Sequence, residues 1–153
     1  MLDLRRELIE DTFASTLETL AFITPLPPEG PPAPPANAVL VRTGFIDSRF
    51  GAVELIAGVA FGRLLLANLL NIGPESPDST EQAIDALKEL TNVVCGRVLR
   101  KLSEQGAGSF QMGIPQAAPA DLDKDWKAFL RDPSACVFDA EGNTLAVRIN
   151  VKV

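Results

Sequence analysis

The run Asp85-Ala86-Leu87-Lys88-Glu89-Leu90-Thr91-Asn92 divides into two faces when it is wound into a helix. Residues three and four positions apart share a helical face, so Asp85, Glu89 and Asn92 project together. Glu89 offers a charged acceptor, and the Asn92 carboxamide donates and accepts hydrogen bonds at once. Such a pair suits the positioning of a water molecule or of a partner's group, without either side chain acting as a nucleophile.

A longer helix extends from this run in both directions. Phased at about 100° per residue, it predicts a core stripe of Ala83, Leu87, Leu90, Val94 and Val98, flanked by Thr91, Cys95 and Leu102. Roughly opposite lies a polar ridge of Asp85, Glu89, Asn92 and Gly96. We expect Asp78 or Ser79 to cap the helix, and Gly106 and Gly108 to end it after about Glu104.

Gly96 is the unusual member of this ridge, because glycine inside a helix costs about 1 kcal/mol relative to alanine. Its lack of a side chain has two interpretations. It lets another molecule approach closely beside Asn92, or it lets a second helix of the same chain pack there.

The other segments predict an α+β fold, with a mixed, mostly antiparallel sheet packed against long helices, in a single domain spanning 1–153. A loop or short helix at 121–130 carries Trp126, the only tryptophan. The expected helices are 2–23 and 61–70, and the expected strands are 38–46, 51–59, 107–118, 135–139 and 144–153.

A proline-rich loop at 25–36 separates the first helix from the first strand. Proline lacks the backbone donor that helices and sheets need, so we expect an extended, solvated spacer. The alternative is a docking segment for an aromatic groove.

Composition excludes several classes of function. The net charge of −6, with no basic cluster, argues against nucleic acid and anionic membranes as partners. No signal-peptide pattern and no apolar stretch of about 18 residues is present, so we expect a cytoplasmic protein. The absence of histidine excludes a Ser-His-Asp triad and a His-ligated metal. Cys95 and Cys136 lack C-x-x-C spacing and are expected in the core.

The string Asp85-x-x-x-Glu89-x-x-Asn92-x-x-x-Gly96 resembles the signature of the CheX-type chemotaxis phosphatases, within the wider CheC/CheX/FliY family. The resemblance covers about residues 38–118. A single copy of the string is similar to CheX-type members, whereas CheC-type members tend to carry two. Further likeness lies in Gly51 to Leu55, Phe61 to Gly73, Leu99 to Gly106, and Pro115.

The resemblance implies a phosphatase that hydrolyses the aspartyl phosphate of a CheY-like response-regulator receiver domain. It implies that Asn92 orients the attacking water, that Glu89 pairs with the receiver's active-site lysine, and that Asp85 adds a contact at the rim. The receiver supplies Mg²⁺, and this chain needs no cofactor of its own. A homodimer through sheet edges is also implied, with the C-terminal strand as the pairing edge. Two alternatives remain: a catalytically inactive receiver-binding or signalling module of the same fold, and a purely structural dimer domain.

Overall fold

A computed structural model describes residues 4–46, 50–70, 80–104 and 110–152 of the 153-residue chain. The helices are α1 (Leu4–Ala21), α2 (Val59–Leu70), α3 (Thr80–Glu104) and α4 (Lys127–Arg131), the last preceded by a π-helical turn, η1 (Leu122–Trp126). The strands are β1 (Ala38–Ile46), β2 (Phe50–Gly58), β3 (Gln111–Met112), β4 (Gln116–Pro119), β5 (Cys136–Ala140) and β6 (Asn143–Lys152). The predicted caps of α3 and its glycine stop lie outside the described residues.

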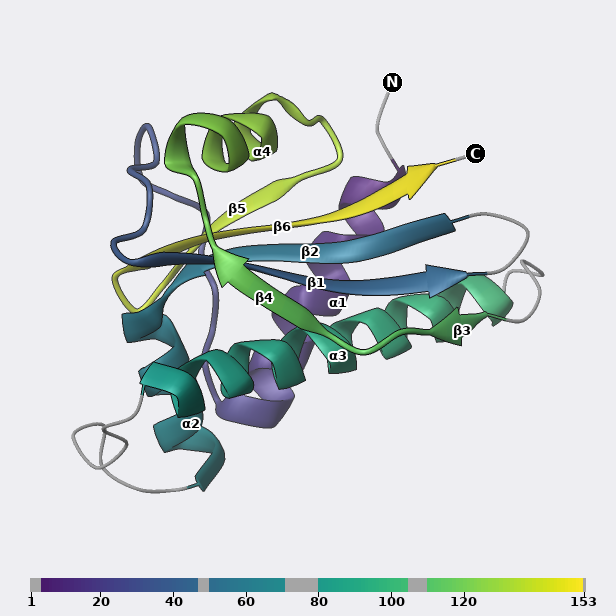
Figure 1. Cartoon of the computed structure of the whole chain (residues 1–153), viewed down its shortest axis with the longest axis horizontal. Helices are drawn as coiled ribbons and strands as arrows, with labels where there is room; N and C mark the ends of the chain where they lie inside the picture. Colours follow the sequence, from purple (N-terminus) through teal and green to yellow (C-terminus); the bar gives the residue numbers. More distant parts are fainter. Residues whose placement is uncertain (1–3, 47–49, 71–79, 105–109, 153) are drawn as a thin grey trace.

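The sheet has the order β3-β1-β2-β6-β5, with β4 also paired to β1, and its strand pairs are antiparallel. α1 and α3 pack on one face, while η1 and α4 lie on the other, and Figure 1 shows these three layers. The α+β prediction is therefore confirmed. The second cover, made by η1 and α4, was not predicted beyond a loop or short helix.

Apolar residues fill both spaces between the layers. The larger core joins α1, α2 and α3 to the inner face of the sheet, and in it Phe13 stacks on Phe138 with ring centroids 5.4 Å apart. On the outer face, Trp126 and Phe129 cover Ile56 and Ala146. β2 is buried on both faces for this reason, which explains why its apolar residues run on without alternation.

β3 and β4 are two halves of one edge strand that a β-bulge interrupts. Met112 pairs with Phe45, and Gln116 pairs with Arg42. Three residues therefore lie between Met112 and Gln116, whereas only two lie between their partners Phe45 and Arg42 on β1. The extra residue falls at Ile114–Pro115, because the Gly113 amide still donates to the Gly44 carbonyl at 2.8 Å.

A network of charges ties α4 and its C-terminal cap to the outer face of the sheet. Glu54, only 7% exposed, accepts from Arg148 Nε at 3.0 Å and lies 3.6 Å from Arg42 Nε. Arg148 also donates to Asp132 at 3.2 Å and sits 4.4 Å from the centre of the Phe129 ring. Burial alone would raise the pKa of Asp132, but hydrogen bonds from Ser134 and the charge of Arg148 outweigh it, so the pKa lies below its usual value. The stability from this carboxylate is thus lost as the pH falls through that value.

The proline-rich segment is mostly exposed and has no regular secondary structure, as expected, but its two ends are anchored. Leu26 forms a two-way backbone bridge with Asp139, with N–O distances of 2.8 and 2.7 Å. Pro25 and Pro35 are buried, and a Cβ on Gly58 would lie 2.5 Å from the Ala36 carbonyl oxygen. The two ends of the segment are therefore anchored to the folded chain, while most residues between them are exposed to solvent.

The C-terminal strand also needs a correction. β6 pairs with β2 from Ala146 to Lys152 and with β5 from Asn143 to Val147, so only its middle has a strand on both sides among the described residues. Its C-terminal end, from Arg148 to Lys152, has β2 alone as a neighbouring strand there. The expected pairing edge is restricted to that end, and the homodimer stays a prediction. No helix in the described part of the chain is long and apolar enough to cross a membrane.

We predict that Glu54→Ala will lower the free energy of unfolding by about 2–3 kcal/mol, because it leaves the partly buried Arg148 guanidinium with only one carboxylate partner. Urea denaturation measures this change. Glu29→Ala, an exposed carboxylate in the proline-rich segment, is the control and should stay within about 0.5 kcal/mol of wild type. Equal stability of the two variants would contradict the structural role given to Glu54.

Candidate functional site: the polar ridge of α3

The packing of α3 decides which of its residues reach solvent. The predicted core stripe is buried, with Leu87, Val94 and Val98 fully enclosed. Thr91 is buried beside them and donates to the Leu87 carbonyl at 2.8 Å, so its hydroxyl is satisfied within the helix. The opposite face is thereby directed away from the core, as the sequence predicts.

The polar ridge, defined as Asp85, Glu89, Asn92 and Gly96, lies on that outward face. Asp85 and Glu89 are exposed, and Asn92 and Gly96 are partly exposed. The side chains of the first three make no hydrogen bond or ion pair with any other described residue. Their acceptors and donors are therefore available to a partner molecule, in a geometry that the helix keeps rigid.

Two basic residues of α3, Arg97 and Lys101, are bonded to α1. Arg97 donates to the hydroxyls of Thr16 and Thr19, both at 3.3 Å, and Lys101 donates to Thr12 at 3.0 Å. These bonds attach one flank of α3 to α1. They hold the helix in place and leave the ridge carboxylates without an internal counter-ion among the described residues.

Gly96 does not serve internal helix packing. A Cβ at this position would meet only the Met112 sulfur, at 3.7 Å, which is an ordinary contact with β3. Gly62 shows the opposite situation, since its Cβ would lie 2.6 Å from the Ala83 carbonyl where α2 crosses α3. The packing interpretation therefore applies to Gly62, and the missing side chain of Gly96 leaves open space on the ridge.

The two cysteines and the acidic side chains of the described residues form no competing centre. Burial raises the pKa of the Cys95 thiol to about 12. The pKa of the Cys136 thiol is also raised to about 12, mainly by burial and secondly by the negative charge of Glu10. Both free thiols stay protonated at neutral pH, as expected of core residues. Within the described residues there is also no group of three or more acidic, histidine or cysteine side chains that could hold a metal.

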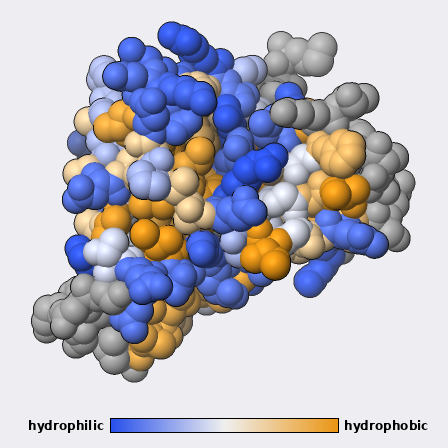
Figure 2. All heavy atoms as spheres, viewed as in Figure 1, coloured by the Kyte–Doolittle hydropathy of each residue, from blue (hydrophilic) through white to orange (hydrophobic). Residues whose placement is uncertain are grey.

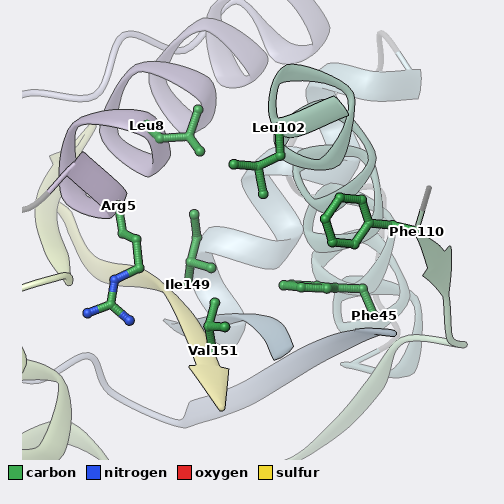
Figure 3. Close-up of a pocket in the computed structure, with 7 residues that line it drawn as sticks. All are labelled: Arg5, Leu8, Phe45, Leu102, Phe110, Ile149 and Val151. Carbon is green, nitrogen blue, oxygen red and sulfur yellow. The ribbon is translucent and has the colours of Figure 1, made fainter. Parts of the chain in front are cut away.

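A cavity of about 290 Å³ lies at the end of the sheet, away from the ridge. Figure 3 shows its apolar side chains converging from α1, α3 and the strands, with Arg5 at the side. Its lining is Arg5, Leu8, Phe45, Leu102, Phe110, Ile149 and Val151. None of these described lining residues is a nucleophile or a carboxylate, so they provide no hydrolytic chemistry.

Comparison with solved structures places this fold in the CheC-like class. A CheC-like superfamily protein from Shewanella sp. PV-4 superposes with a TM-score of 0.70 at 19% identity, covering 100% of both chains. A CheX from Vibrio vulnificus gives 0.73 at 16% identity, over 98% of this chain and 100% of that one. A CheX from Borrelia burgdorferi, in complex with CheY, BeF₃ and Mg²⁺, superposes with a TM-score of 0.69 at 18% identity, covering 96% of this chain and 97% of that one.

The particular family follows from the sequence itself. Residues 39–121, more than half of the chain, match the model of the chemotaxis phosphatase CheX, so the chain belongs to the CheX family. The resemblance stated for the Asp85 to Gly96 string is thereby confirmed at the level of the family, and the activity that this family carries is that of a phosphatase. No curated protein sequence matches the chain.

Sequence reasoning missed the residues that border the ridge. Met112 touches the open position at Gly96, and Ile114 projects from the neighbouring bulge with 85% of its surface exposed. A strand was predicted over 107–118, but its interruption was not. The signal was the Gly113-Ile114-Pro115 run, since glycine and proline inside a strand often mark a bulge.

Gly96→Ala should raise the free energy of unfolding by about 0.5–1 kcal/mol, because alanine favours the helix and its methyl group fits beside Met112. Gly62→Ala is the matched variant and should lower it, because its Cβ would collide with the Ala83 backbone. Thermal denaturation of both compares them directly. A loss of stability in Gly96→Ala would show that this glycine is needed by the fold itself.

Proposed function

We propose that this chain hydrolyses the aspartyl phosphate of a CheY-like receiver domain by positioning a water molecule with Asn92. The observation that carries the proposal is the exposed ridge of α3. There Glu89 and Asn92 stand one turn apart, without a described intramolecular partner. Membership of the CheX family supports a phosphatase, and the Borrelia burgdorferi CheX structure contains CheY as its partner.

The chemistry divides between two proteins. The receiver carries the phosphoryl group on its own aspartate and holds the Mg²⁺, as CheY does with BeF₃, a phosphoryl stand-in, in the Borrelia burgdorferi complex. Water attacks phosphorus, the bond from phosphorus to the carboxylate oxygen breaks, and the products are free aspartate and inorganic phosphate. Because the receiver already neutralises the phosphoryl charge, placing the water in line is the main task left to this chain.

The ridge residues have distinct roles in this mechanism. The Asn92 carboxamide accepts a hydrogen bond from the water and orients its lone pair toward phosphorus. Glu89 pairs with the receiver's active-site lysine and sets the height at which α3 docks. Asp85, one turn further toward the N-terminus, adds a charged contact at the rim. Gly96 leaves room for the receiver to come within van der Waals distance of the helix.

Asn92→Ala should reduce kcat for phosphate release from a phosphorylated CheY receiver by about 10²-fold, because the water loses its positioning group. The stability and the receiver affinity should change little, since the side chain has no internal bond. Asn150→Ala removes a partly exposed carboxamide from the outer face of the sheet and serves as the control. Equal turnover by wild type and Asn92→Ala would refute the mechanism. Tight receiver binding without turnover by wild type would instead identify a non-catalytic module.

Glu89→Gln should weaken binding of the phosphorylated receiver about tenfold, because a charge-assisted hydrogen bond to lysine is lost while shape is kept. Asp85→Asn, at the rim, should have a smaller effect. Titration at low and high salt measures both, and the wild-type advantage should shrink as salt rises. Glu29→Gln controls for net charge. If Glu89→Gln and Glu29→Gln behave alike, no specific ion pair exists.

A further inference from the structure

The bulged edge strand runs beside α3 in the opposite direction. At one end Met112 lies against Gly96, and at the other Ala117 to Pro119 line a cavity together with Thr80 and Ile84. The helix rises about 24 Å from Thr80 to Gly96, and the strand covers about 23 Å from Met112 to Pro119. These two stretches therefore have similar lengths, so a position along the strand can be matched to a level along the helix. Figure 1 shows that they run in opposite directions.

This correspondence places the bulge at the level of Asn92. Ile114 lies two residues, or about 7 Å, beyond Met112. The same distance along the helix, counted back from Gly96, leads to about Asn92. On α3, Asn92 lies toward the strand side of the ridge, because Cys95 and Leu99 on that flank are buried against the sheet.

The bulge holds its backbone firmly while it directs one large apolar side chain outward. Strand pairing at Met112, the bond from Gly113 to Gly44, and pairing at Gln116 fix the chain on both sides. Ile114 is 85% exposed and Met112 is 38% exposed. Figure 2 shows a hydrophobic patch over the connection between β3 and β4, among hydrophilic side chains. A single exposed isoleucine is common, but this one stands on a rigid support beside the proposed water-positioning residue.

We propose that Ile114, supported by Met112, is the apolar anchor on which the receiver domain docks. This inference rests on the proposed function and names a determinant of partner affinity for it. A receiver whose phosphoryl group reaches Asn92 must cover the adjacent bulge, so an apolar part of the receiver surface beside its phosphorylated aspartate packs on Ile114. The charges of the polar ridge orient the receiver, and the burial of Ile114 adds binding affinity.

Ile114→Ser tests the anchor without disturbing the fold, since the side chain is exposed. Its KM for phosphorylated CheY receiver should rise at least about tenfold, the effect of burying one isoleucine on binding, while kcat at saturation stays within about twofold. Asn92→Ala is expected to do the reverse, lowering kcat while leaving receiver affinity nearly unchanged. Leu130→Ser is the matched control, because Leu130 is an exposed apolar residue of α4 on the other side of the sheet.

A binding measurement separates the anchor from the catalytic proposal. Isothermal titration with CheY receiver held in its BeF₃- and Mg²⁺-bound form should show the same weakening for Ile114→Ser and none for Leu130→Ser. Equal affinity of wild type and Ile114→Ser would overturn the anchor and leave the phosphatase mechanism standing. No binding and no turnover by wild type would overturn both. An equal loss in Ile114→Ser and Leu130→Ser would assign the effect to general surface hydrophobicity and would also reject the anchor.

Discussion

The burial of one stripe of α3 against the sheet is the constraint on which the rest of the molecule depends. Leu87, Leu90, Val94 and Val98 are enclosed almost completely, and rotating the helix by one residue would expose them to water. The bonds from Arg97 and Lys101 to α1 oppose the same rotation. The orientation of Glu89 and Asn92 is thus a by-product of core packing, and the site needs no supporting hydrogen bonds of its own.

The pattern of apolar residues was sufficient to predict α3 and its two faces, because one long amphipathic helix contains the whole ridge. The terminal hairpin and the first two strands were also predictable from their local composition. Two features depended on contacts distant in sequence. The bridge between Leu26 and Asp139 anchors the start of the proline-rich segment, and the outer cover by Trp126 and Phe129 requires a sheet already formed. Neither contact leaves a periodic signal in the chain.

The polar ridge offers hydrogen-bonding groups in a fixed geometry and few groups of high chemical reactivity. The described residues of this chain bring no metal cluster and no reactive thiol, and the outward face of α3 offers rigid geometry instead. In phosphoryl transfer, positioning and electrostatic stabilisation account for most of the catalysis. In the proposed mechanism the partner supplies the Mg²⁺ and the phosphoryl group, so a short stretch of helix is enough, provided that the surrounding surface brings the two molecules together in one orientation.

The bulge at Ile114–Pro115 has a further consequence for how such a surface can change over evolutionary time. Met112 and Ala117 both face α3 although five positions separate them, and removal of one residue between them would restore a regular strand with both still facing inward. The loss or replacement of the inserted residue would therefore change the exposed surface beside α3 and leave the register of Met112 and Ala117, and with it the interior packing, unchanged.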